Sequence, residues 1–214
     1  MLARVPTVKK YTENNARQGF FEVDDFERVV VLLPEDIQDF VRFAYHSGWR
    51  RGEIAQLTWR DVEDEVIRLR PEICKTRDGR VLGLVGDIAE IIARRRALRS
   101  NHVLWVFHRI LRGKVRPVGR FDKVWRKACT AAGVPGRLVH DFRRSTVRNM
   151  TRAGVPEKIA MSITGHKTRA IFDRYNITNE EDIRAGQTRT QEYLTRRRGT
   201  SSFSPEYGQN TDNE

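Results

Sequence analysis

One segment of this chain concentrates side chains that can bind and cut a phosphate ester. Residues 140–176 of the 214 contain two histidines, one tyrosine and several arginines. Arginine is always charged and can donate to two phosphate oxygens at once, and a tyrosine hydroxyl can replace water as the nucleophile. Two further cations precede the segment and complete the candidate set, which consists of Arg50, Lys75, His140, Arg143, His166 and Tyr175.

Each candidate also has an ordinary structural explanation. A pair spaced by three residues, such as Arg50 and Glu53, is often only a salt bridge on one helix face. A histidine at a helix start or after a glycine often belongs to a cap or a turn. A tyrosine near a helix end usually packs, and a lysine beside a hairpin turn is usually exposed. Taken together, however, these side chains predict a site for an anionic substrate.

Other catalytic signatures are missing from the sequence. It has neither the GxSxG elbow of a serine hydrolase nor a GxxxxGK phosphate loop for ATP. Cys74 and Cys129 are the only cysteines, without CxxC spacing, and no carboxylates or histidines have the spacing of metal ligands. The sequence therefore predicts a site without cofactor or metal, in which side chains neutralise the charge of the transition state.

The charge of the chain indicates a polyanionic partner. The net charge is +12 and the isoelectric point is near 10.3. Residues 1–72 have a net charge of −3, whereas residues 73–214 have a net charge of +15. Lysine and arginine are densest in residues 108–127. A single charge run is commonly just a solvated face. An excess spread over several segments instead predicts a surface that follows nucleic-acid phosphates.

The sequence gives no sign of export or of membrane insertion. No apolar run approaches the roughly 18 residues of a membrane span, and the N-terminus lacks the apolar core of a signal peptide. Two cysteines without a pairing pattern fit a reducing compartment. We therefore expect a cytoplasmic protein that associates with nucleic acid and makes no membrane contact.

The elements that must position the candidate residues are mostly helical. Extended runs at residues 66–69 and 81–84 flank Asp78 and Gly79, a strong turn signal, and predict a small antiparallel sheet with Lys75 near the turn. Apolar spacing, caps and glycine breaks predict helices elsewhere, at residues 25–33, 34–48 with Gly48 as C-cap, 50–57, 87–98, 120–133, 141–154, 156–164 and 179–198. The expected fold class is mainly α with a small antiparallel β-sheet.

Four stretches contain the candidate residues: HSGWRRGEIAQLTWRDV, CKTRDGR, HDFRRSTVR and TGHKTRAIFDRYN. In this order, and with nine residues from His166 to Tyr175, they resemble the motifs of the tyrosine recombinases of the phage-integrase type. The resemblance covers about residues 20–195. It implies the catalytic-domain fold of that family and double-stranded DNA as the substrate.

The resemblance implies that three of the candidates take part in breaking and forming bonds, one as the nucleophile and two by moving protons. Tyr175 would attack the scissile phosphate, form a 3′-phosphotyrosine link and release a 5′-hydroxyl. His140 would assist proton transfer at the nucleophile, and Lys75 would be the general acid for the leaving oxygen. A 5′-hydroxyl of a second strand would then attack the phosphotyrosine and restore the backbone, so neither ATP nor metal is needed.

The resemblance also implies how the phosphate would be bound. Arg50 and Arg143 would clamp its non-bridging oxygens, and His166 would donate a further hydrogen bond. Arg50 is chosen over the next arginine because the motif places the catalytic arginine three residues before Glu53. Glu53 and Asp61 are interpreted as supports of the site.

The resemblance suggests how the chain is organised. Residues 1–20 would be a linker or arm, residues 21–178 the catalytic domain, and residues 199–214 a disordered tail. The family's separate N-terminal DNA-clamping domain has no counterpart, so the chain would be a part of a longer recombinase or a naturally short one. The helix at residues 179–198 either caps its own domain or is received by a neighbour, because these enzymes work as tetramers on two DNA duplexes.

Three other functions fit parts of the sequence. A type IB topoisomerase shares the tyrosine chemistry but only relaxes DNA, and the short chain and the GHKTRAIFDRYN stretch favour recombination. A non-catalytic DNA-binding remnant would explain the missing clamp domain, although the candidate set is complete. A basic RNA-binding protein would show surface aromatic residues on a sheet or an RNP-like motif, which are not found.

Overall fold

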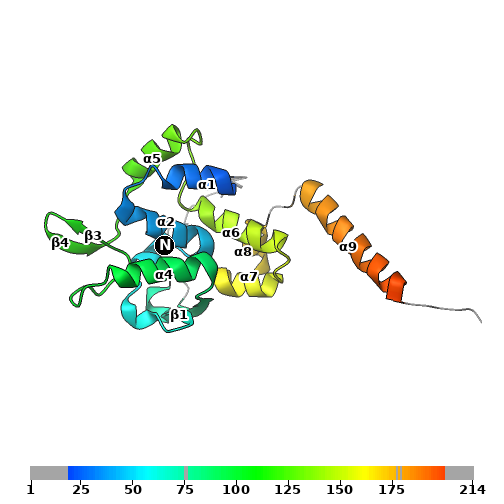
Figure 1. Ribbon diagram of the computed structural model, residues 1–214, viewed down its shortest axis with the longest axis horizontal. Helices are drawn as coiled ribbons and strands as arrows, with labels where there is room; N and C mark the ends of the chain where they lie inside the picture. The colour runs from blue at the N-terminus through cyan, green and yellow to red at the C-terminus, as the bar shows by residue number, and fades with distance from the viewer. Residues whose placement is uncertain (1–18, 75–76, 177, 179, 201–214) are drawn as a thin grey trace, which may run out of the picture. The chain divides into compact units, whose positions relative to one another are not determined.

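The computed structural model describes residues 19–74, 77–176, 178 and 180–200. The chain divides into two compact units, Met1–Asn176 and Ile177–Glu214. In the first unit the strands are β1 (Val66–Leu69), β2 (Arg80–Gly83), β3 (His108–Leu111) and β4 (Lys114–Pro117). Its α-helices are α1 (Val23–Val30), α2 (Glu35–Ser47), α3 (Arg51–Ala55), α4 (Gly86–Ala97), α5 (Asp122–Ala131), α6 (Asp141–Arg152), α7 (Glu157–Thr164) and α8 (Arg169–Asp173) (Figure 1). This confirms the predicted mainly helical class.

Helix α2 packs against both α4 and α6 (Figure 1). Its Ile37, Phe40 and Val41 are fully buried, because apolar residues recur at helical spacing along one face. The helix ends at Gly48, whose φ of 64° confirms the predicted C-cap. A Cβ at Gly48 would lie only 3.0 Å from Cβ of Thr146, so glycine also permits the close approach of α6.

The predicted antiparallel pairing of two extended runs is present, but Asp78 and Gly79 do not form a tight turn, because β1 ends at Leu69, a turn of 3-10 helix follows at Pro71–Ile73, and Gly79 directly precedes β2. Strands β1 and β2 are antiparallel, with Leu69 opposite Arg80. Burial alternates along β2, and Arg80 and Leu82 are its buried residues. The hairpin therefore turns a charged side chain inward at the start of β2.

The prediction of a single small sheet is wrong, and so is the prediction that the rest is helical. Strands β3 and β4 pair as a second hairpin within the basic run at residues 108–127. Its turn residues, Arg112 and Gly113, both have positive φ, as a two-residue hairpin turn requires. The many basic residues in this run hide the alternation of apolar and polar side chains that would predict a strand. Helix α8, capped by the side chain of Thr168, was also not predicted.

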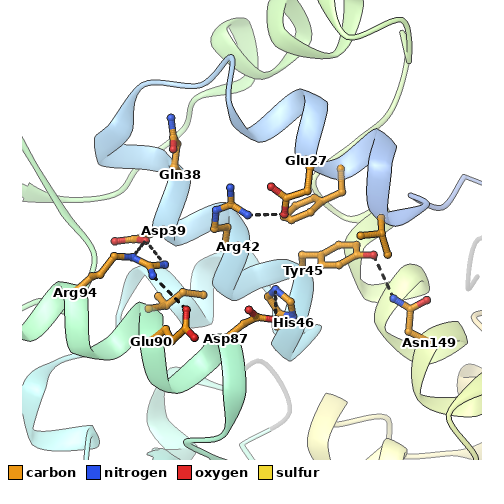
Figure 2. Close-up of a pocket in the computed structure, with 13 residues that line it drawn as sticks. Glu27, Gln38, Asp39, Arg42, Tyr45, His46, Asp87, Glu90, Arg94 and Asn149 are labelled. Carbon is orange, nitrogen blue, oxygen red and sulfur yellow. Dashed lines mark hydrogen bonds and ion pairs between the residues drawn. The ribbon is translucent and has the colours of Figure 1, made fainter.

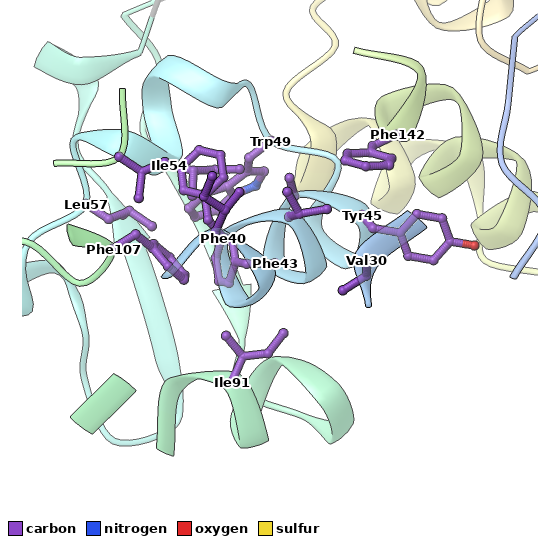
Figure 3. Packing of buried hydrophobic residues seen from close by; sticks show 14 of the residues in the cluster. Val30, Phe40, Phe43, Tyr45, Trp49, Ile54, Leu57, Ile91, Phe107 and Phe142 are labelled. Atoms are coloured by element: carbon purple, nitrogen blue, oxygen red, sulfur yellow. The ribbon is translucent and has the colours of Figure 1, made fainter. Parts of the chain in front are cut away.

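The core of the first unit is rich in aromatic rings (Figure 3). The ring of Phe40 meets the rings of Phe107 and Phe121 edge-on, with centroids 5.7 and 5.8 Å apart. Phe142 of α6 packs in the same way against Phe26 and Trp125, at 5.4 and 5.3 Å. These contacts fix α6, which carries Arg143, against the rest of the unit.

Removing one methylene from this core should have a measurable cost. Ile91 of α4 is 1% exposed, whereas Ile110 of β3 is 69% exposed. We expect Ile91→Val to lower the free energy of unfolding by about 1 kcal/mol, and Ile110→Val to change it by less than about 0.5 kcal/mol. Urea unfolding of both variants measures this, and equal losses would contradict the assignment of the core.

The second unit contains α9 (Glu180–Thr200), which agrees with the helix predicted at residues 179–198. Acidic residues occupy its first turn and arginines its last, which complements the helix dipole. Residues 199 and 200, the first two of the predicted disordered tail, are instead the last residues of α9, whereas residues 201–214 lie outside the described residues, as do residues 1–18 of the predicted arm. None of the described helices is long and apolar enough to cross a membrane.

Candidate active site

Arg50 lies immediately before α3 and is held there by Glu53. The backbone N–H of Arg50 donates to Oε2 of Glu53 at 2.9 Å, and its Nη1 donates to Oε1 at 3.0 Å. Glu53 is buried, while the side chain of Arg50 is about a quarter exposed. The spacing of three residues thus forms the ion pair that the sequence indicated, with the arginine accessible.

A second arginine, Arg80, completes the pairing of Glu53. Its Nη2 lies 2.6 Å from Oε2 of Glu53, and its Nη1 donates to the carbonyl of Thr164 at 2.6 Å. Burial alone would raise the pKa of Glu53. The charge of Arg80 and hydrogen bonds from both arginines instead hold that pKa below its ordinary value. Glu53 is therefore an ionised support.

Arg143 is buried beneath the site and anchored by three groups. Its Nη1 donates to the carbonyl of Gly48 at 2.9 Å and also to that of Thr164. Its Nε donates to Nε2 of His166 at 3.0 Å. Burial, followed by the charge of Arg50, lowers the pKa of Arg143 to about 10, so it stays charged at neutral pH. Among the described residues, nothing accepts a hydrogen bond from its buried Nη2.

The hydrogen bonds of His166 define its tautomer. Because Nε2 accepts from Arg143, the ring proton of the neutral imidazole is on Nδ1, which lies 2.7 Å from Oγ1 of Thr164. That hydroxyl in turn donates to the carbonyl of Ala160 at 2.7 Å. Burial, then the charges of Arg143, Arg50 and Arg80, lowers the pKa of His166 to about 3. His166 is therefore neutral at pH 7.

The neutral His166 should make stability depend on pH. Its folded pKa of about 3 lies below the ordinary value of 6.5, so the unfolded chain takes up the proton first as pH falls. The stabilisation is complete above pH 6.5 and is lost as pH falls toward 3. Between pH 7 and 5.5, this titration should lower the unfolding free energy of the wild type by about 1 kcal/mol. We expect the His166→Gln variant to lack that decrease. Urea titrations at both pH values measure this, and unchanged pH dependence would contradict it.

The hydroxyl of Tyr175 meets the imidazole of His140. Nε2 of His140 lies 3.1 Å from Oη of Tyr175, so the neutral ring can accept the phenolic proton. The side chain of His140 is exposed but partly desolvated by its neighbours, and this desolvation, followed by the charge of Arg143, lowers the pKa of His140. The ring of Tyr175 also lies 4.7 Å from that of His166. The guanidinium of Arg144 lies 5.5 Å from the centre of the Tyr175 ring.

The local chain path explains how Tyr175 is positioned. Helix α8 is anchored by Phe172, which is fully buried against Val147 of α6 and Ala160 of α7. The backbone N–H of Tyr175 donates to the carbonyl of Phe172 at 2.8 Å, which turns the chain directly after the helix. Five of the six predicted catalytic residues are thus described. The sixth, Lys75, lies outside the described residues.

Asp61 supports a different part of the fold. Its buried carboxylate accepts from the backbone and hydroxyl of Thr58, at 2.8 and 2.7 Å, and pairs with Arg70. Burial acts to raise the pKa of Asp61, but these partners keep it lowered. Asp61 therefore fixes the turn of 3-10 helix at Trp59–Asp61 that leads into β1.

Sequence reasoning missed three residues of this cluster. Arg80 begins β2 in phase with the inward-facing Leu82, and that alternation was the signal that could have identified it. Arg144 follows Arg143, and its Nε and Nη1 are buried and have no acceptor among the described residues. Thr164 acts largely through its backbone carbonyl, for which no sequence signal exists.

Two cavities lie near these elements. One, of about 500 Å³, is bordered by Arg80, Gly165 and His166 together with charged residues of both signs, among them Lys167 and Asp78. The other, of about 620 Å³, is lined by charged pairs of α1, α2 and α4 and contains none of the predicted site residues (Figure 2). Its pairs include Glu27 with Arg42. No group of three or more potential metal ligands occurs in the described parts of the chain.

The chain matches the model of the phage integrase family over residues 26–182. The integrase of Salmonella phage P22 is 26% identical over 188 residues, which covers 82% of this chain and 48% of the phage protein. Prophage integrase IntR of Escherichia coli strain K12 is 23% identical over 215 residues, with 82% and 52% covered. The chain thus spans about half the length of these curated relatives.

Solved recombinase structures share the fold. XerA recombinase superimposes with a TM-score of 0.64 at 17% identity, covering 80% of this chain and 63% of that chain. A lambda integrase dimer bound to a COC' core site gives 0.61 at 16% identity, with 74% and 47% covered. A lambda integrase tetramer bound to a Holliday junction gives 0.61 at 15% identity, with 74% and 48% covered. The predicted catalytic-domain fold is confirmed.

Proposed function

Because the chain belongs to the phage integrase family, we propose that it is a site-specific DNA recombinase that cuts and rejoins strands through a 3′-phosphotyrosine intermediate. One observation carries the proposal: the hydroxyl of Tyr175 lies 3.1 Å from Nε2 of His140, beside the buried guanidinium of Arg143. A packing tyrosine has no need of a neutral imidazole at its hydroxyl and a buried cation under its ring. A nucleophile that attacks a phosphate uses both, because the imidazole takes its proton and the nearby cation binds the phosphate.

In the proposed cleavage step, one bond to phosphorus forms and one breaks. Oη of Tyr175 bonds to phosphorus while the bond from phosphorus to O5′ breaks. Nε2 of His140 takes the phenolic proton, which the lowered pKa of His140 allows at neutral pH. Lys75 supplies a proton to the leaving O5′. Attack by a 5′-hydroxyl reverses each transfer and rejoins the strand.

The arginines would stabilise the charge of the transition state. Arg50 is partly exposed and fixed by Glu53, and Arg143 keeps a buried Nη2 without an acceptor among the described residues. Arg50 can therefore donate to a non-bridging oxygen directly, and Arg143 can do so once the groups that cover its Nη2 move aside. His166 holds Nε of Arg143, so in this arrangement it orients that arginine. For His166 to donate to the phosphate as well, its Nε2 must gain a proton and release Arg143.

The proposed partners are double-stranded DNA and further copies of the chain. The positive balance of residues 73–214 suits a surface that follows phosphates, and we expect DNA binding that weakens as salt increases. As in the lambda integrase tetramer on a Holliday junction, four copies would act on two duplexes. Helix α9 would then be received by a neighbouring copy, and residues 21–178 would form the catalytic domain. A cytoplasmic location follows from DNA as the substrate.

Incubation of the protein with supercoiled plasmid and a metal chelator tests the proposal. We expect a covalent protein–DNA adduct after denaturation, and recombined products once two plasmids carry the target site. Relaxed plasmid without exchange between plasmids would favour the topoisomerase alternative. Salt-sensitive binding without any adduct, persisting when a DNA-clamping domain is added in cis, would favour the non-catalytic alternative.

A further inference from the structure

Arg80 links two parts of the candidate site that come from different elements. One oxygen of the Glu53 carboxylate lies 2.6 Å from Arg80, and the other holds Arg50 at 3.0 Å. The carbonyl of Thr164 accepts both from Arg80, at 2.6 Å, and from Arg143. A continuous line of contacts therefore runs from Arg50 through Glu53, Arg80 and Thr164 to Arg143.

We propose that Arg80 is a positioning residue for strand cleavage, an inference that rests on the function proposed above. It helps to set the spacing between Arg50 and Arg143, the two guanidiniums that would clamp the phosphate. The carbonyl of Gly48, two residues before Arg50, ties the backbone there to Arg143 on α6, and Arg80 adds a second tie that acts on the Arg50 side chain through Glu53. A displacement of about 1 Å in such a clamp can cost about a hundredfold in rate.

The surroundings of Arg80 fit a guanidinium closely. Its Cζ lies 5.6 Å from the centre of the Trp49 ring, and its two terminal nitrogens reach acceptors on different elements. On the other side, a Cβ added to Gly165 would lie 2.1 Å from Nη1 of Arg80 and 2.6 Å from its Cζ. Gly165 directly precedes His166, so Arg80 also packs on the backbone that presents this histidine. A lysine ammonium could not reach both acceptors in the same geometry.

The direct test replaces the branched guanidinium of Arg80 with a lysine ammonium, which keeps the positive charge. We expect Arg80→Lys to slow adduct formation at saturating plasmid DNA about 10- to 100-fold, because the clamp loses its spacing. The dissociation constant for plasmid DNA should change by less than about twofold, since Arg80 is buried. Arg68→Lys on the exposed side of β1 is the matched control, and it should leave the rate unchanged.

A second pair of variants tests the position of the Arg80 guanidinium by changing Gly165, the residue that it packs against. Gly165→Ala forces the guanidinium aside and should slow adduct formation as Arg80→Lys does. Gly133→Ala is the control, because Gly133 has the same left-handed backbone, with φ of 78°, but open space around a Cβ. If Gly165→Ala acts through the guanidinium, it should slow the Arg80→Ala variant far less than it slows the wild type.

The outcomes separate the two proposals. If the wild type forms the adduct and Arg80→Lys forms it equally fast, the positioning role is wrong and the proposed function stands. If the wild type forms no adduct even with a DNA-clamping domain added in cis, the proposed function fails and the role of Arg80 fails with it. Equal slowing by Gly165→Ala and Gly133→Ala, or additive effects of Gly165→Ala and Arg80→Ala, would also overturn the inference. Should Arg80→Ala not fold, Arg80→Lys and the two glycine variants decide.

Discussion

Tyr175→Phe is expected to abolish the covalent adduct, lowering the rate of strand cleavage by at least about a thousandfold. The substitution removes the one oxygen that can bond to phosphorus and keeps the ring, which packs near His166 and Arg144. The lost hydrogen bond to His140 is exposed, so the free energy of unfolding should fall by about 1 kcal/mol or less. Denaturing gels of protein and labelled plasmid measure the adduct, and binding assays measure the affinity, which should be unchanged.

A second tyrosine provides the control. Tyr193→Phe makes the same chemical change on α9 and should leave the rate of adduct formation as it is. An adduct that persists in Tyr175→Phe would assign the nucleophile to another residue. An adduct lost in both variants would instead indicate that α9 is required for assembly of the active complex.

Local patterns allowed much of the fold to be predicted. Helical spacing of apolar residues identified α2, and Gly48 marked its end, because a left-handed C-cap excludes most other residues. Two extended runs identified the pairing of β1 and β2, although Asp78 and Gly79 directly precede β2 and form no tight turn between the strands. These elements could be predicted since each depends on residues that are close in sequence.

The contacts that assemble the site could not be predicted in this way. Arg143 is held by the carbonyls of Gly48 and Thr164, 95 and 21 residues away, and backbone carbonyls leave no trace in a sequence. The tautomer of His166 follows from Arg143 on one nitrogen and Thr164 on the other. Family motifs indicated which residues would meet, but they gave no role to Arg80, the last residue of the CKTRDGR stretch, because its role depends on burial beside Glu53.

Arg143→Lys should show how much of the chemistry depends on the shape of the guanidinium. The arginine uses Nη1 for two carbonyls and Nε for His166, and this leaves Nη2 for a phosphate oxygen. A lysine keeps the positive charge but has one nitrogen, which cannot hold the carbonyls and His166 while also reaching the phosphate. We expect the rate of adduct formation to fall about 100- to 1,000-fold.

The same substitution should also destabilise the fold. With lysine at position 143, the carbonyl of Gly48 and Nε2 of His166 cannot both keep their donor, whereas the carbonyl of Thr164 retains Arg80; the loss should cost about 1 to 3 kcal/mol of unfolding free energy. Arg28→Lys, at an exposed ion pair of α1, should cost less than about 0.5 kcal/mol and leave the rate unchanged. If Arg143→Lys retained full activity, charge alone would suffice and the guanidinium clamp would be wrong. If it lost activity without losing stability, the anchoring by the carbonyl of Gly48 and by His166 would be energetically negligible, and the arginine would serve the phosphate alone.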